Sequence, residues 1–270
     1  MDELGTEVRL YRRLIGARLR GQMQYRASFL LQVVGNALLH LMELLAIFIL
    51  FQRFERLGGW RAGEVAFLYG LSSLSFGLAH TFSAGFDGFG RQIVRGEFDR
   101  VLVRPLSAFV QVLAADVALR QLGRILSGLV AFGFALRLVE IDWTLGRLLY
   151  LPVIIVSAAI LFVALFTLEA TLCFWTTEAT EVVNAFTYGG TTLAQYPLHV
   201  FDAWLRRLFL YIIPVGFVIY APALYLLDKD TPLALPPATR FLAPVAAIAF
   251  ALAAGAAWRF GVRHYRSTGS

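Results

Sequence analysis

The chain has 270 residues, 59% of which are hydrophobic, and its mean hydropathy is +0.68. Soluble domains contain about 45–50% apolar residues, and here the excess lies in continuous runs of about 20 residues, the length of a membrane-spanning helix. A net charge of +6 would indicate nucleic-acid binding in a soluble protein, but most basic residues flank the apolar runs, where they orient spans. We therefore predict an all-α integral membrane protein in a lipid bilayer, with no nucleic-acid partner.

Residues 1–26 are predicted to form a basic amphipathic helix that lies in the membrane interface. Six arginines occupy most of its surface, and one apolar stripe recurs at helical spacing. The stripe consists of Leu4, Val8, Tyr11, Ile15, Leu19 and Met23. The alternative is an orientation signal that has only some helicity.

About six transmembrane helices are predicted over residues 27–259, followed by a basic cytoplasmic tail at 260–270. Five spans are expected at about 27–52, 64–83, 119–138, 148–174 and 241–259. The remaining crossing is either 178–196, which is weakly apolar, or 208–227, which carries no charge but two prolines. The segment that does not cross should be a re-entrant element packed within protein.

The distribution of arginine and lysine predicts the orientation of the chain. Fifteen of these residues lie in segments 1–26, 84–124 and 259–270, whereas seven lie in the opposing loops. Because loops with more basic residues stay in the cytoplasm, both termini are predicted to be cytoplasmic. An even number of crossings is then required, and six fits.

Nucleotide and metal chemistry are not expected in this chain. A Walker A loop needs glycines before a lysine that contacts the phosphates, but the only lysine, Lys229, follows Leu-Leu-Asp. The four histidines are scattered, and a single cysteine, Cys173, excludes an internal disulfide and a cysteine-based metal cluster. We therefore predict a non-catalytic protein that has no cofactor of its own.

Residues 84–107 form a long loop of mixed charge between the second and third spans. Phe89, Ile93 and Val94 lie at helical spacing and precede Gly96, which is typical of a helix C-cap. We expect exposed apolar residues in this loop, surrounded by charges of both signs, a combination that suits docking into a groove of another protein. The alternative is a solvated loop that only satisfies the charge rule for orientation.

Residues 93–106, IVRGEFDRVLVRPL, resemble the cytoplasmic signature of permease subunits of ATP-binding-cassette (ABC) exporters of the type-2 class. The signature is roughly Ile-x-x-Gly-x-x-Asp-x-x-Leu-x-x-Pro. The resemblance extends to the basic N-terminal helix, the six spans, the Tyr196-Pro197 step and the apolar segment that contains Pro214. It is strongest with short permeases that have no ATPase domain.

This resemblance implies that loop 84–107 is a coupling helix that contacts separate ATP-binding subunits, present in two copies and holding ATP and Mg. It also favours 178–196 as the fifth span and implies a bacterial cytoplasmic membrane. The residues that the resemblance assigns to coupling are Arg91, Ile93, Arg95, Gly96, Glu97, Phe98, Asp99, Leu102, Arg104 and Pro105.

A polar stripe runs along one face of the first span. Gln32, Asn36, His40 and Glu43 are separated by three or four residues, so they share a helix face. Because charged groups are costly at membrane depth, we expect this face to line a translocation path or a seam between subunits. A self-satisfied polar network between helices is the alternative. Glu169 in the fourth span is similar and is the candidate partner of His40.

Two functions remain open on the sequence. The first is a permease subunit of an ABC exporter, and because six helices are few for a path, a second permease chain, identical or similar, should complete it. The alternative is a stand-alone membrane protein, either a secondary carrier or an intramembrane enzyme. A carrier usually has an internal repeat, and none is visible. The neighbouring gene for an ATP-binding subunit would decide between them.

Overall fold

The computed structural model describes residues 3–176, 180–230, 233 and 235–266. Within these ranges every regular element is a helix, apart from one isolated β-bridge between Leu57 and Trp60. The prediction of an all-α membrane protein is therefore confirmed. Parts of three predicted segments lie outside the described residues: the first two residues, the start of 178–196 and the last four residues.

The helices differ widely in length, and short ones join the long ones. In chain order they are α1 (Glu3–Met23), α2 (Arg26–Arg53), α3 (Ala62–Ser83), α4 (Phe89–Val94), α5 (Glu97–Leu102), α6 (Ala108–Leu113), α7 (Leu122–Leu138), α8 (Leu145–Leu172), α9 (Thr180–Ala194), α10 (Ala203–Arg207), α11 (Ala221–Leu226) and α12 (Ala243–His264). Short 3-10 or π-helical turns precede α7, α10, α11 and α12.

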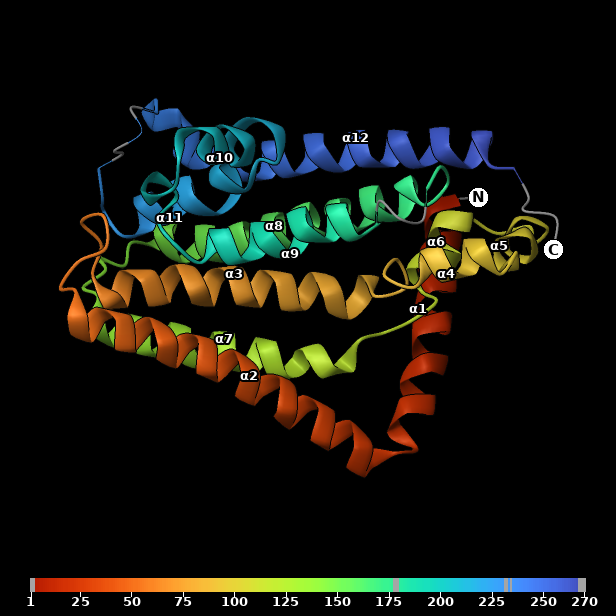
Figure 1. The fold of residues 1–270 in the computed structure, drawn as a ribbon, viewed down its shortest axis with the longest axis horizontal. Helices are drawn as coiled ribbons and strands as arrows, with labels where there is room; N and C mark the ends of the chain where they lie inside the picture. The colour runs from red at the N-terminus through yellow and green to blue at the C-terminus, as the bar shows by residue number, and fades with distance from the viewer. Residues whose placement is uncertain (1–2, 177–179, 231–232, 234, 267–270) are drawn as a thin grey trace.

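Five helices in the described ranges are long and apolar enough to cross a membrane: α2, α3, α7 with its preceding turn, α8 and α12. They lie side by side along the long axis of the molecule, with α3 in the middle (Figure 1), and almost all residues of α3 are buried. The bounds of these helices coincide with the five predicted spans to within a few residues at most ends. The exception is α12, which continues to His264, so the predicted tail at 260–270 begins inside a helix.

The ambiguous region separates into two elements of different geometry. Helix α9 lies alongside α8 (Figure 1) and, with 15 residues, is shorter than each of the five long helices. In contrast, segments Ala203–Ile212 and Gly216–Leu226 are bent by 79° relative to each other, and both lie at the same end (Figure 1). Pro214 lies in the break, where its missing N–H interrupts helical hydrogen bonding.

Helices α1, α4, α5 and α6 and the C-terminal end of α12 lie together at one end of the bundle, which we call the α1 end; α10 and α11 lie at the other, the α11 end (Figure 1). Helix α1 is held to the bundle by part of its apolar stripe. Ile15 is buried against Ala114 and Val117, and the Tyr11 hydroxyl donates to the Phe82 carbonyl over 2.8 Å. Burial raises the pKa of Tyr11 to about 12, so this hydroxyl remains a donor at neutral pH.

Helices α2 and α7 approach closely at a glycine. A Cβ atom at Gly123 would overlap the Val33 carbonyl and lie 2.6 Å from the Ala37 amide nitrogen. One turn further on, the Ser127 hydroxyl donates to the Ala37 carbonyl over 3.0 Å. Small residues at such contacts allow the backbones of membrane helices to pack against each other.

We expect Gly123→Ala to weaken the α2–α7 contact, because the added methyl group meets backbone atoms that cannot rotate away. Overpacking of this kind costs about 1–3 kcal/mol. Gly133→Ala on the same helix is the matched control, since no described atom outside its own turn lies within 4 Å of the new Cβ position. Thermal unfolding in mild detergent should show a lower midpoint for Gly123→Ala alone. Equal midpoints would show that α2 is not held at this point.

Candidate functional site

Helices α4 and α5 form a tight helical pair at the α1 end. Gly96 joins them with a φ of +64°, a left-handed conformation that glycine adopts without a steric penalty. Its amide donates to the Ile93 carbonyl over 3.0 Å, which closes α4 as the sequence predicted. The residues of the signature therefore fold as two short helices that meet at a sharp turn.

An aromatic cluster joins this pair to the long helices. It consists of Phe89, Phe98, Phe174, Trp258 and Tyr265, whose rings come from α4, α5, the end of α8, α12 and the segment after α12. The centroid of the Phe98 ring lies 5.1 Å from Phe89, 5.5 Å from Phe174 and 5.1 Å from Tyr265. Edge-to-face contacts at such distances add to the free energy of burial. The pair is thus connected mechanically to α8 and α12.

The expectation that the apolar residues of loop 84–107 are exposed is wrong for several of them, including Phe86 at 2% exposure. Phe89, Ile93 and Phe98 are buried, and Phe98 has 0% exposure. They belong to the main hydrophobic core, so they position the helical pair and cannot contact another protein directly.

Other residues of the pair are available at its surface. Val103 is 82% exposed, and Val94, Leu102 and Leu106 are exposed as well. Five more of the residues predicted for coupling are exposed: four are charged, and the fifth is a proline. They are Arg91, Arg95, Glu97, Arg104 and Pro105. Arg95 and Glu97 form an ion pair at 4.0 Å, and Asp99 is partly buried. This surface combines apolar and charged side chains, as the sequence predicted for the loop as a whole.

The polar stripe of α2 is divided between different environments. His40 Nδ1 lies 3.0 Å from Glu43 Oε2, and the Tyr69 hydroxyl of α3 donates to the His40 carbonyl over 2.6 Å. The Asn36 side-chain oxygen is buried without a hydrogen bond within the described part of the chain. Gln32 and Glu43 are exposed in the single chain, and the expectation that the stripe lines a path or a seam between subunits stays a prediction.

Arg124 of α7 is a site residue that the sequence reasoning missed. The side chain is buried, with its guanidinium carbon 4.2 Å from the centroid of the Phe76 ring. Its charge lies near the Glu43 carboxylate, which accepts from the Tyr69 hydroxyl, and Tyr188 packs against the same Phe76 ring. The Arg124 Nε has no hydrogen-bond partner among the described residues. Its position inside the third apolar run could have indicated that it lies between the spans. We call Glu43, Tyr69, Arg124 and Tyr188 the central polar cluster.

Glu169 is not the partner of His40, contrary to the candidate pairing. It lines a separate cavity of about 360 Å³ with Asp87, Arg91, Arg95 and Asn184. Its Oε2 is buried and has no hydrogen bond within the described ranges. This cavity lies between α4 and the helices α8 and α9, and its lining includes Arg91 and Arg95, two of the exposed arginines predicted for coupling.

These features define a multi-pass helical membrane protein with a helical pair at one end and a polar cluster between its spans. A family model described as "ABC-2 family transporter protein" matches residues 37–269. The chain therefore belongs to the ABC-2 transporter family, as the resemblance predicted, and is a membrane component of a transport system that works with ATPase partners. No curated protein and no solved structure matches it.

Proposed function

We propose that this chain is the non-catalytic permease subunit of an ATP-driven exporter in the bacterial cytoplasmic membrane. The observation that supports this function best is the α4–α5 pair, which presents Val94, Leu102 and Val103 at its surface while Phe89 and Phe98 attach it to the bundle. An element that couples a partner to the membrane needs both properties, because a displacement of its outer face must reach the spans.

Two ATP-binding subunits would hold ATP and Mg and bind the α4–α5 surface. When they close, the pair moves, and the aromatic cluster transfers this displacement to α8 through Phe174 and to α12 through Trp258. Packed aromatic side chains have few alternative rotamers, so they transmit displacement between rigid helices. This chain contributes no catalytic residue to ATP hydrolysis in this proposal.

A second permease chain, identical or similar, would complete the translocation path. The stripe residues Gln32, Asn36, His40 and Glu43 would line this path or the seam between chains. In favour of a partner there, Glu43 has a side chain that is 49% exposed although it lies in the middle of a span. A carboxylate that faces lipid is costly, whereas one that faces a hydrated path is not.

The proposed topology has six crossings and both termini in the cytoplasm. Helix α9 is the fifth crossing, and the bent segments around Pro214 form a re-entrant element at the outer end. Two observations support this choice: the 79° bend and the position of α1, α4 and the end of α12 at one end of the bundle (Figure 1). Single cysteines introduced at Arg56 and at Gly5 should react with an impermeant reagent from outside and inside, respectively; the reverse pattern contradicts the topology.

We expect Val103→Asp to abolish co-purification of the ATP-binding subunit while the permease folds normally. Val103 contacts little of its own chain, so the substitution puts an unpaired carboxylate into the proposed apolar contact, at a cost above the roughly 1–3 kcal/mol of an unpaired neutral polar group. Phe54→Asp is the matched control, because Phe54 is an exposed apolar residue at the α11 end. The measurement is pull-down of the complex together with its ATPase activity. Full recovery of partner with Val103→Asp contradicts the assignment of this surface.

A further inference from the structure

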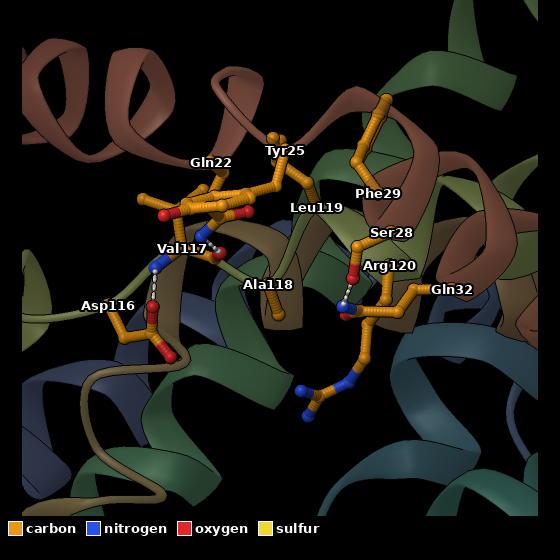
Figure 2. A pocket seen from close by; sticks show the side chains of 10 residues that line it. All are labelled: Gln22, Tyr25, Ser28, Phe29, Gln32, Asp116, Val117, Ala118, Leu119 and Arg120. Carbon is orange, nitrogen blue, oxygen red and sulfur yellow. Dashed lines mark hydrogen bonds between the residues drawn. The ribbon is translucent and has the colours of Figure 1, made fainter.

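A polar cavity lies at the elbow where α1 meets α2. It has a volume of about 300 Å³, and its walls come from Gln22 and Tyr25 at the elbow, from Ser28, Phe29 and Gln32 on α2, and from segment 116–120 before α7. Figure 2 shows these side chains around the space, with Gln22 and Asp116 on one side and Gln32 and Arg120 on the other. We call this cavity the elbow pocket.

Hydrogen bonds hold the walls of the elbow pocket in place. Gln22 Nε2 donates to the Val117 carbonyl over 2.6 Å, which ties α1 to the segment before α7. Asp116 Oδ1 accepts from the Val117 amide over 2.8 Å. The pocket is therefore formed by residues that are fixed relative to one another, although they come from three separate segments.

The pocket carries two opposite charges that do not neutralise each other. The Asp116 carboxylate and the Arg120 guanidinium lie on different sides of the space (Figure 2). In the part of the chain that the structure describes, neither side chain belongs to an ion pair. A ligand that carries both a cation and an anion would offer a partner to each group.

The surroundings of the pocket combine basic, aromatic and apolar surface, a combination typical of protein at the boundary between lipid headgroups and acyl chains. Helix α1 is basic and leads directly into α2, whose side chains beyond the elbow, Leu30, Leu31 and Val34, are exposed and apolar. Tyr25 at the elbow is also exposed, and tyrosine is enriched at membrane–water interfaces. A molecule in the pocket would have its polar end among fixed hydrogen-bonding groups and its apolar end along α2.

We propose that the elbow pocket binds the headgroup of a zwitterionic aminophospholipid of the inner leaflet. Arg120 binds the phosphate, because a guanidinium matches phosphate oxygens with two parallel donors. Asp116 binds the primary ammonium group, and Gln32 and Ser28 supply neutral donors and acceptors beside the phosphate. An anionic headgroup without an amine would leave Asp116 unpaired and repelled. This lipid site is independent of the transport role proposed above.

The test is native mass spectrometry of the full chain, with any subunits that co-purify, in neutral detergent containing equal amounts of phosphatidylethanolamine and phosphatidylglycerol. We expect wild-type protein to retain one phosphatidylethanolamine preferentially. Arg120→Gln should reduce retention of both lipids at least tenfold, and Asp116→Asn should shift the preference to phosphatidylglycerol. Arg137→Gln, an exposed basic residue at the other end of α7, is the matched control and should bind as wild type does.

Two results would overturn the proposal. One is equal lipid retention by Arg120→Gln and Arg137→Gln, with thermal unfolding showing that both are folded. The other is displacement of the lipid by millimolar inorganic phosphate in the wild-type protein, which would identify a site for soluble phosphate. Because no ATPase measurement enters this test, its failure leaves the permease function untouched, and failure of the co-purification experiment leaves the lipid site untouched.

Discussion

Phe98→Ala is expected to destabilise the permease by about 3–5 kcal/mol, the usual cost of removing a buried phenylalanine ring. The ring is fully buried and contacts Phe89, Phe174 and Tyr265, so its removal leaves a cavity between the helical pair and the long helices. Unfolding in mild detergent, followed by tryptophan fluorescence, measures the change, because Trp258 lies in the same cluster.

The matched control for Phe98→Ala is Val103→Ala in the turn that follows the same short helix. Val103 is exposed, and surface substitutions usually change stability by less than about 0.5 kcal/mol. Phe98→Ala should also weaken coupling in whatever ATPase complex still forms, since Phe89 is then the one ring of the α4–α5 pair that still contacts Phe174 within the aromatic cluster. Wild-type stability of Phe98→Ala would show that the pair is held by other contacts and that the aromatic cluster does not transmit displacement.

The long spans could be predicted from the sequence because every apolar residue of a span adds to the hydropathy of the same run. A run of about 20 apolar residues has few alternatives to a membrane helix, and α2, α3, α8 and α12 follow such runs. The choice between 178–196 and 208–227 was open because length and hydropathy alone do not show a bend. The position of Pro214 indicated an interruption, but the 79° angle depends on how both arms pack.

In the helical pair, the sequence pattern did not predict which apolar residues are buried. Phe98 and Val103 are both apolar residues in a charged segment, yet one is buried and the other is 82% exposed. Periodicity assigns residues to a face of a helix but not to a partner. In elements of six residues, the partner is decided by distant segments, here by Phe174 and Trp258.

The polar residues between the spans were predicted in part. His40 and Glu43 were placed on one helix face and do form a pair, since residues three apart are neighbours on a helix. The pairing of His40 with Glu169 could not be tested by spacing, because it depends on how α8 rotates against α2. Arg124 was counted among loop charges, so a charge that orients spans and a charge inside the bundle were not distinguished.

Arg124 has an unusual position for a charged residue in a membrane protein. It is only 7% exposed, lies over the Phe76 ring, and has an Nε without a partner among the described residues. A buried charge without full hydrogen bonding opposes folding. Charged residues that lower the stability of membrane spans usually line ion or substrate pathways. We propose this role for Arg124 beside Glu43.

Arg124→Leu is therefore expected to leave stability unchanged or to raise it by about 1–3 kcal/mol, because it removes a buried Nε donor that has no partner among the described residues, while Glu43, at 49% exposure, stays solvated. Loss of the contact with Phe76 offsets part of this gain, by about 0.5–2 kcal/mol. Substrate-dependent transport or ATPase activity of the complex should fall strongly. Arg124→Gln keeps hydrogen-bond donors without the charge and should lose activity as well, whereas Arg137→Leu, exposed on the same helix, should retain it. The contradicting outcome is an Arg124→Leu variant that unfolds as easily as Phe98→Ala. The guanidinium would then be a structural counter-charge for Glu43. The central polar cluster would hold the helices together without lining the path.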